Sequence, residues 1–221
     1  MEEIQPGIYR ENDNLYTVNA NPGEKVYGEG LYDRDGREFR AWHGNRSKAA
    51  AAVLNGVDLG IEKDDEVLYL GASTGTTVSH FSDILADGFI YAVEYSDTVI
   101  RNLVNLAEKR ENIAPILGDA RKPAEYEDLI DGKVDVVFQD ISQSDQPEIF
   151  TKNAENFLKE DGVALIAVKA HSISTSKDEE EVFQEVKNKL SENFEIVEEV
   201  KLEPYENNHL FLKMELKGET Q

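Results

Sequence analysis

Two lysines, an aspartate and a histidine stand at the ends of predicted secondary-structure elements, where side chains can meet a substrate. Lys48 begins a predicted helix, and Asp140 directly follows a predicted strand. Lys169 ends the apolar run 164–168, and His209 opens the last predicted strand. A lysine that ends a buried strand needs a partner, and Asp140 on the neighbouring strand is the expected one. A carboxylate beside cations suits the activation of a hydroxyl group, although each residue alone could be a solvated charge, a helix cap or a hairpin residue.

A small-residue loop, 71–77, follows the first strand of this pattern and leads into a helix. Such a loop lets a ligand lie against backbone amides at the helix start. Glu94 ends the next strand, 19 residues after Gly75, where an acid is placed to bind ribose hydroxyls. Asp119 follows the third strand and could reach an adenine amino group. Together these features predict a nucleoside-binding edge, whereas the missing Gly-x-Gly-x-x-Gly pattern argues against NAD.

The same loop permits a rival interpretation as a serine hydrolase. Residues 71–75 fit Gly-x-Ser-x-Gly, and Asp140 and His209 follow Ser73 in the chain order of a catalytic triad. The motif follows the first parallel strand, whereas a nucleophile elbow belongs deep in the hydrolase sheet, and no His-Gly-Gly loop precedes it. The hydrolase is therefore the weaker alternative.

The elements that must position these residues alternate between strands and helices. Strands are predicted at 66–70, 89–94, 113–117, 134–139, 163–168, 194–201 and 209–216, and helices at about 76–85, 98–109, 123–130, 146–158 and 177–190. This alternation is typical of an α/β fold with a mostly parallel sheet and helices on both faces. The last two strands are too close for a helical crossover and should form an antiparallel hairpin.

Residues 1–45 differ from the rest of the chain. Short alternating stretches at 8–10, 15–18 and 38–42 are separated by turn-forming residues, which predicts a small antiparallel β lobe. An Ala-rich helix is expected over 49–54, with Asn45 or Ser47 near its N-cap. We therefore expect two parts, the lobe 1–45 and a seven-stranded α/β domain 46–221.

The composition restricts the classes of protein to which the chain could belong. With 45 acidic and 23 basic residues, a net charge of −22 argues against autonomous binding of RNA phosphates and suggests a helper or a salt-rich source. The chain has no cysteine, which excludes disulfides and thiolate metal sites, and we expect no metal. No apolar run is long enough to span a membrane and the start lacks a signal peptide, so a cytoplasmic location is expected.

Four stretches of sequence resemble the archaeal fibrillarin-like ribose methyltransferases. They are Asn45-Arg46-Ser47-Lys48-Ala49-Ala50-Ala51, Tyr69-Leu70-Gly71-Ala72-Ser73-Thr74-Gly75-Thr76-Thr77-Val78-Ser79-His80, Gln139-Asp140-Ile141-Ser142-Gln143 and Val168-Lys169-Ala170. The similarity covers essentially the whole chain and implies a Rossmann-like methyltransferase sheet.

The resemblance also implies a reaction and its residues. The expected function is S-adenosylmethionine-dependent 2′-O-methylation of ribose in rRNA or tRNA, guided by box C/D RNA in a particle with a Nop-type scaffold protein and a kink-turn-binding protein. The implied catalytic set is Lys48, Asp140, Lys169 and His209. Cofactor contacts are implied for Gly71, Ala72, Ser73, Gly75, Thr76, Thr77, Glu94, Tyr95, Asp119, Ala120, Asp140 and Gln143. A methyltransferase acting on another substrate and a non-catalytic cofactor-binding scaffold subunit are the remaining alternatives.

Roles follow from the chemistry of these side chains. Asp140 is expected to position the hydroxyl, Lys169 to accept or steer its proton, and Lys48 to orient the substrate. A rim of cations for RNA phosphates is expected at Arg34, Arg37, Arg40, Arg46, Arg121 and Lys122, with scattered surface charges as an equal alternative.

Overall fold

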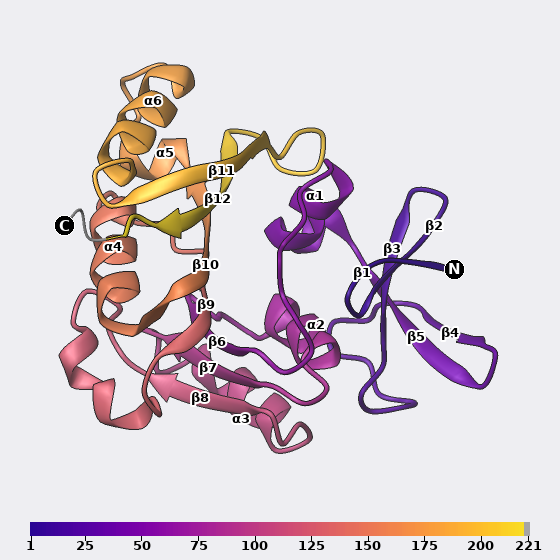
Figure 1. The fold of residues 1–221 in the computed structure, drawn as a ribbon. Helices are drawn as coiled ribbons and strands as arrows, with labels where there is room; N and C mark the ends of the chain where they lie inside the picture. Colours follow the sequence, from indigo (N-terminus) through magenta and orange to yellow (C-terminus); the bar gives the residue numbers. More distant parts are fainter. Residues whose placement is uncertain (219–221) are drawn as a thin grey trace.

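Seven strands form the main sheet in a computed structural model that describes residues 1–218 (Figure 1). They are β6 (Glu66–Leu70), β7 (Phe89–Glu94), β8 (Ile113–Leu117), β9 (Val134–Gln139), β10 (Leu158–Lys169), β11 (Phe194–Lys201) and β12 (His209–Leu216). Their order is β11-β12-β10-β9-β6-β7-β8, and the five strands from β10 to β8 are parallel. β12 runs antiparallel to both of its neighbours, as predicted. All five parallel strands therefore end at one edge of the sheet.

Two layers of helices bury the two faces of this sheet. One apolar cluster joins α1 (Lys48–Leu54), α2 (Thr76–Ile84) and α3 (Ile100–Ala107) to Val67 and Tyr69 of β6. The other joins α4 (Gln146–Phe157) and α6 (Glu179–Leu190) to Leu68 and Leu70 of the same strand. Successive strand side chains point to opposite faces, so a strand buried on both faces must be apolar throughout. The predicted fold class is confirmed, and α5 (Ala170–Ile173) adds a short turn after β10.

The segment 123–130 does not form the predicted α-helix. It forms two short 3₁₀ turns, η2 (Pro123–Glu125) and η3 (Glu127–Leu129). Tyr126 separates them with φ −133°, outside the helical range, and its buried ring stacks on Phe157. Burial of this single side chain outweighs the local helix signal. Smaller differences occur at ends: β10 begins at Leu158, and α6 begins after its N-cap Asp178.

A second, five-stranded antiparallel sheet forms the N-terminal lobe, at the right of Figure 1. It contains β1 (Glu2–Gln5), β2 (Ile8–Glu11), β3 (Asn14–Val18), β4 (Leu31–Arg34) and β5 (Arg37–Trp42), in the order β1-β2-β3-β5-β4. The turn η1 (Gly44–Arg46) connects it to α1, whose N-cap is Ser47. The lobe is present as expected, and the division of the chain at residue 45 stays a prediction.

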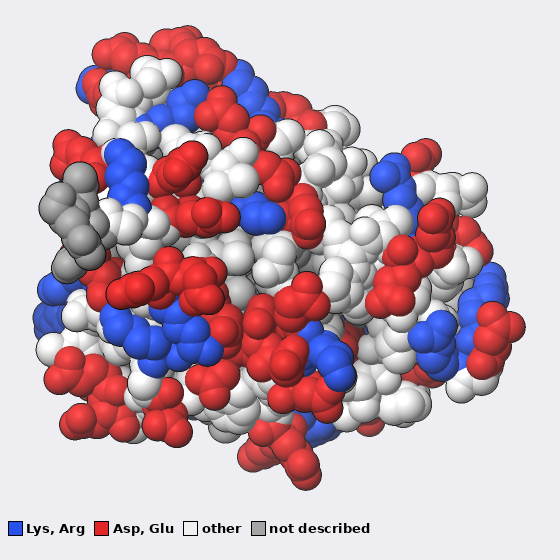
Figure 2. Space-filling model, in the orientation of Figure 1, with Lys and Arg blue, Asp and Glu red and all other residues white. Residues whose placement is uncertain are grey.

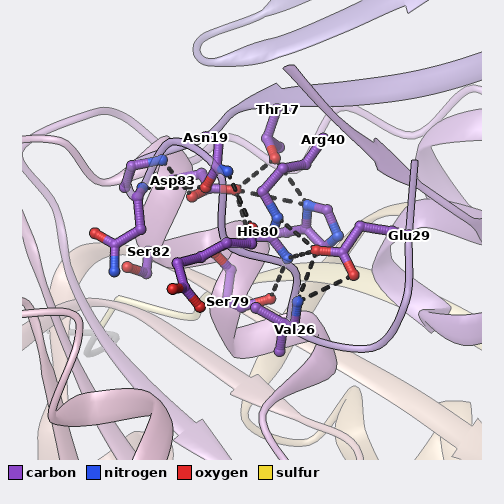
Figure 3. Close-up of polar contacts among 12 residues, drawn as sticks. Thr17, Asn19, Val26, Glu29, Arg40, Ser79, His80, Ser82 and Asp83 are labelled. Atoms are coloured by element: carbon purple, nitrogen blue, oxygen red, sulfur yellow. Dashed lines mark hydrogen bonds and ion pairs between the residues drawn. The ribbon is translucent and has the colours of Figure 1, made fainter. Parts of the chain in front are cut away.

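A buried polar network joins the lobe to α2 (Figure 3). Arg40 of β5 is 0% exposed; its guanidinium lies 2.7 Å from a Glu29 carboxylate oxygen and 2.8 Å from Asp83 Oδ2. Arg110 contacts the other oxygen of Asp83 at 2.7 Å. Two cations and two carboxylates thus compensate each other inside the protein, as buried charges require. The prediction that Arg40 contacts RNA is wrong, because its side chain is enclosed.

His80 belongs to the same network. Its Nδ1 lies 2.8 Å from Thr17 Oγ1, its Nε2 lies 2.8 Å from Tyr27 Oη, and its ring stacks on Trp42. Burial, with Arg40 and Arg110 nearby, holds the pKa of His80 well below its ordinary value. The imidazole is therefore neutral in the folded protein.

Acidification is expected to destabilise the fold before its carboxylates titrate. Because the folded-state pKa of His80 lies below the unfolded value of about 6.5, the unfolded state takes up more protons as the pH falls through this value. The free energy of unfolding should be constant above that pH and decrease below it, by up to about 1.4 kcal/mol per pH unit for each such histidine. Urea unfolding between pH 7.5 and 5 measures this slope. His171 is exposed, so His171→Gln should keep the slope of the wild-type protein and serves as the control. A free energy of unfolding that does not change with pH in the wild-type protein would contradict the prediction.

The surface is strongly acidic. Figure 2 shows patches of Asp and Glu spread across the visible face, with smaller groups of Lys and Arg among them. Many of the cations are paired, such as Lys63 with Asp87 at 2.9 Å and Lys109 with Glu24 at 2.8 Å. Among the described residues, no helix has the length and apolar character that crossing a membrane requires.

Candidate active site

The loop after β6 is held tightly against the end of β9. Gly71 has φ +83°, and a Cβ on it would lie 2.3 Å from the backbone oxygen of Asp140, so no other residue fits there. Gly75, with φ +89°, is the N-cap of α2, and its amide donates to the carbonyl of Ala72. Thr77 Oγ1 donates to Ser47 Oγ at 3.0 Å, which fastens the start of α1 to this loop. The loop therefore brings Lys48 to the same sheet edge as Asp140.

Two carboxylates organise the neighbouring strand ends. Glu94 accepts the amide of Ser73 on one oxygen and the amide of Ser96 on the other, both at 2.8 Å. Asp119 accepts the amide of Arg121 at 3.0 Å. Each contact uses part of the accepting capacity of a carboxylate, so lone pairs stay free for ligand hydroxyl or amino groups. Tyr95, beside Glu94, is 74% exposed and presents a ring surface to solvent.

A cavity of about 450 Å³ lies between these strand ends. Its lining includes eight of the predicted cofactor residues, namely Gly71, Ser73, Glu94, Tyr95, Asp119, Ala120, Asp140 and Gln143. The cavity is not lined by the other four predicted cofactor residues, Ala72, Gly75, Thr76 and Thr77. Gly75 and Thr77 instead shape the loop. The volume and the apolar floor, which includes Val93 and Ile149, suit a nucleoside-sized ligand. Val93, Gly118, Ile141, Ser142 and Ile149 were not predicted, although all but Ile149 adjoin predicted strand ends.

Arg121 ties together two loops that border the cavity. Its Nε and Nη2 each donate to Asp145 at 2.7 Å, and Nη2 also donates to Gln143 at 2.9 Å. This two-pronged pairing fixes the loop after β9 against the loop after β8. The nearby Lys122 is paired with Glu125 at 3.0 Å. Both cations were expected at an RNA rim; in the structure each is engaged by a carboxylate.

Lys48 and Asp140 form an ion pair at the mouth of the loop. Nζ lies 3.1 Å from Oδ2, and each side chain is 22% exposed. The backbone amide of Asp140 donates to the carbonyl of Leu70 at 3.0 Å, so the pair is anchored to the central strands. The prediction that Lys169 is the partner of Asp140 is wrong. The α1 helix, which cannot be placed beside β9 from sequence, delivers Lys48 instead.

Lys169 ends β10 directly opposite His209 of β12 in the antiparallel register. Gln146 holds its backbone: the Lys169 amide donates to Oε1 at 3.1 Å, and Nε2 donates to the Lys169 carbonyl at 3.3 Å. Within residues 1–218 no carboxylate lies within 4.0 Å of the half-buried Lys169 ammonium. Its charge is therefore available to a substrate. No sequence signal identified Gln146 as its positioning residue.

His209 carries an unused acceptor. Its side chain is largely buried, and its Nδ1 lies 2.7 Å from the carbonyl of Asn207, to which it donates. Burial lowers the pKa of His209, and the charge of Lys48 lowers it further, although the Asn207 carbonyl opposes both effects. The neutral ring thus has a bare Nε2, which is buried without a partner among the described residues. A buried acceptor of this kind calls for a donor from a ligand or a water molecule.

The hydrolase triad does not form among the described residues. Asp140 is paired with Lys48, His209 donates Nδ1–H to the Asn207 carbonyl, and no hydrogen bond joins Ser73 to the histidine. Without the Asp–His and His–Ser contacts the serine has no general base.

Comparison with known proteins gives one consistent result. The family model described as Fibrillarin matches residues 2–218. A relative from Thermococcus sibiricus, named fibrillarin-like rRNA/tRNA 2′-O-methyltransferase, is 48% identical over 214 residues, or 94% of each chain. A solved fibrillarin/Nop5p complex contains a chain with a TM-score of 0.91 and 42% identity, covering 98% of this chain and 100% of that one. Fibrillarin of Aeropyrum pernix, solved with natively bound S-adenosyl-L-methionine, has a TM-score of 0.88 and 38% identity, with 96% of both chains covered.

Proposed function

The chain belongs to the fibrillarin family, and from this premise and its site we propose that it transfers the methyl group of S-adenosylmethionine to ribose 2′-hydroxyls of rRNA or tRNA. One observation carries the proposal. The Lys48–Asp140 pair, with Asp140 also lining the cavity, lies at the sheet edge where β10 and β12 bring Lys169 opposite His209. A nucleoside cavity and a charged acceptor site thus share one aspartate.

The cavity residues fit the cofactor by size and by donor set. Free lone pairs of Glu94 would bind the cofactor ribose, with the Tyr95 ring beside it. Asp119 and Ala120 would lie at the adenine, and Gln143 at the methyl end. When bound, the sulfonium supplies an electrophilic methyl group. The remaining task of the protein is to hold the attacking oxygen at about 3 Å on the line of displacement.

The charged groups would perform that task. Asp140, itself fixed by Lys48 and by the Leu70 carbonyl, orients the 2′-hydroxyl. Lys169 stabilises the negative charge that develops on the oxygen, because its ammonium has no competing carboxylate nearby in residues 1–218. The departing proton would pass through a bridging water molecule to Nε2 of His209, which is neutral, buried and without a partner among the described residues, rather than to Lys169 as the sequence suggested.

Arg121 is expected to strengthen cofactor binding without joining the chemistry. In Arg121→Ala the loop after β9 loses its tie to the loop after β8, so the KM for S-adenosylmethionine should rise about 2- to 5-fold, as the loss of a well-formed exposed ion pair allows. The kcat should change much less. Lys159→Ala, which breaks the 2.6 Å pair with Asp135 at the other end of β9, is the matched control. An equal effect on both variants, or a loss confined to kcat, would contradict this role.

Partners follow from the charge. A chain with a net charge of −22 grips RNA poorly by itself, so a box C/D guide RNA, a Nop-type scaffold protein and a kink-turn-binding protein would supply much of the contact. The solved fibrillarin/Nop5p complex supports the scaffold partner. A cytoplasmic location, expected from the sequence, stays a prediction.

The deciding experiment is transfer of a labelled methyl group from S-adenosylmethionine to a guide-paired RNA, with and without the partner proteins. We expect label on the target ribose and none on RNA with a 2′-deoxy target nucleotide. Label on the 2′-deoxy RNA would move the reaction to another atom. Binding of the cofactor without transfer by the complete particle would favour the non-catalytic scaffold subunit. Labelling of Ser73 by a fluorophosphonate without cofactor binding would favour the hydrolase.

A further inference from the structure

A second groove, of about 420 Å³, lies on the other side of the cofactor loop, between the lobe and α3. Its walls are Asn21 and residues 24–27 of the lobe, Arg46, Thr74 and Thr76 of the loop region, and residues of α3 and of the segment that continues to Arg110. It does not share a residue with the cofactor cavity. Arg46 stands two residues before Lys48, and Thr76 one residue before Thr77, which binds Ser47. The groove therefore leads toward the charged acceptor site.

The charge of this groove is opposite to that of the whole chain. Its lining contains four cations, Lys25, Arg46, Lys109 and Arg110, and a single acid, Glu24. Glu24 is paired with Lys109, and Arg110 with Asp83 below. Lys25 and Arg46 have no carboxylate within 4.0 Å among residues 1–218. In a protein with about twice as many acids as bases, two unpaired cations in one groove require a reason.

The geometry of Arg46 suits an anionic ligand. Its guanidinium lies over the ring of Tyr27, 5.6 Å from the centroid. Stacking on the ring face restricts the guanidinium while leaving its N–H edge free to donate. Asn102 and Asn105 add side-chain amides to the opposite wall, and the structure gives neither amide a hydrogen-bond partner within residues 1–218. The groove thus offers charged and neutral donors with little competing negative charge.

We propose that this groove binds the sugar-phosphate backbone of the target RNA strand beside the methylated nucleotide, with Lys25 and Arg46 on the phosphates; this rests on the proposed function. A strand that enters through the groove would pass Arg46 and then Lys48 before presenting its ribose to Asp140. Of the six cations expected at an RNA rim, Arg46 is the one that lines this groove. The groove would also explain how an acidic protein holds substrate locally.

The test measures target-RNA use by the reconstituted particle over a range of salt concentrations. In Lys25→Ala and Arg46→Ala we expect the KM for target RNA to rise about 10-fold or more, as the loss of a charged hydrogen bond predicts. The slope of log(kcat/KM) against log[salt] should decrease by about 0.7 for each phosphate that the protein no longer neutralises. Neither the KM for S-adenosylmethionine nor the melting temperature should change. Lys133→Ala removes a charge at the opposite edge of the sheet and is the control.

A modified RNA locates the contact on the substrate. Replacing single phosphates next to the target nucleotide with neutral methylphosphonates should reproduce the loss in wild-type protein, and have little further effect in Arg46→Ala. Unchanged KM and salt slope in both variants would overturn the proposal, as would an effect confined to S-adenosylmethionine. Competition by inorganic phosphate with no change in RNA use would assign the groove to a free anion and overturn it too. If wild-type particles transfer no methyl group, the proposed function itself fails.

Discussion

Asp140→Ala is expected to lower kcat for methyl transfer by about 10²-fold or more, because the attacking hydroxyl loses the carboxylate that positions it. The substitution removes the carboxylate that orients the hydroxyl and leaves Lys48 without its partner at 3.1 Å. Single-turnover transfer from labelled S-adenosylmethionine in the assembled particle measures the chemical step directly. Asp140→Asn keeps the shape and loses the charge, so it separates orientation from electrostatics.

A matched control removes an aspartate from a lysine pair elsewhere. Asp87→Ala breaks the 2.9 Å pair with Lys63 at the opposite edge of the sheet and should leave kcat within a factor of about two, as surface pairs generally do. Equal rates for wild type and Asp140→Ala would remove this residue from the mechanism. A change only in the KM for S-adenosylmethionine would restrict it to the cofactor cavity.

Arg40→Met is expected to destabilise the protein by about 3–5 kcal/mol, because the buried Glu29 loses its cation and the buried Asp83 loses one of its two. Met fills much of the same volume, so the loss reports the missing charge and hydrogen bonds rather than a cavity. Urea unfolding followed by circular dichroism and by the fluorescence of Trp42 gives the free energy of unfolding. Trp42 lies in the lobe, next to His80, and therefore reports on this junction.

Arg34→Met provides the comparison, since Arg34 is exposed on the β4–β5 hairpin and should change stability by no more than about 0.5 kcal/mol. Adding Glu29→Gln to Arg40→Met removes one of the unpaired charges and should recover part of the loss. Similar stabilities for Arg34→Met and Arg40→Met would show that the network contributes little. Separate transitions for the two probes would show that the lobe unfolds independently.

Much of the fold could be predicted because its signals are local. Most strands from β6 to β12 are apolar runs bounded by turn residues, β11 alternates apolar and charged residues, and the strand ends differ from prediction mainly in β10. The segment 123–130 was wrong because burial of Tyr126, a tertiary effect, decides its conformation. The family and fold are confirmed by the matching model and solved structures.

The candidate site was predictable to the extent that topology determines it. Parallel strands end at one edge, so Gly71, Glu94, Asp119 and Asp140 had to meet there. Pairing within the site was not predictable, because Lys48 reaches Asp140 from a helix whose place depends on the lobe. Arg40 looked like a surface cation, since nothing in the sequence distinguishes an enclosed arginine from a solvated one. Arg121 is exposed, but its pairing with Asp145 could not be predicted.

The network in Figure 3 has a consequence for any attempt to dissect the chain. Cutting at residue 46 would open Asp83, Arg110 and the His80 ring to water and strip Ile8, Leu15 and Trp42 from the core they share with α1 and α2. The larger fragment would then expose an apolar surface prone to association, and α2 would lose its polar contacts at Ser79, His80 and Asp83. The small sheet therefore completes the core on one face of the large sheet, and the two are expected to fold as one unit.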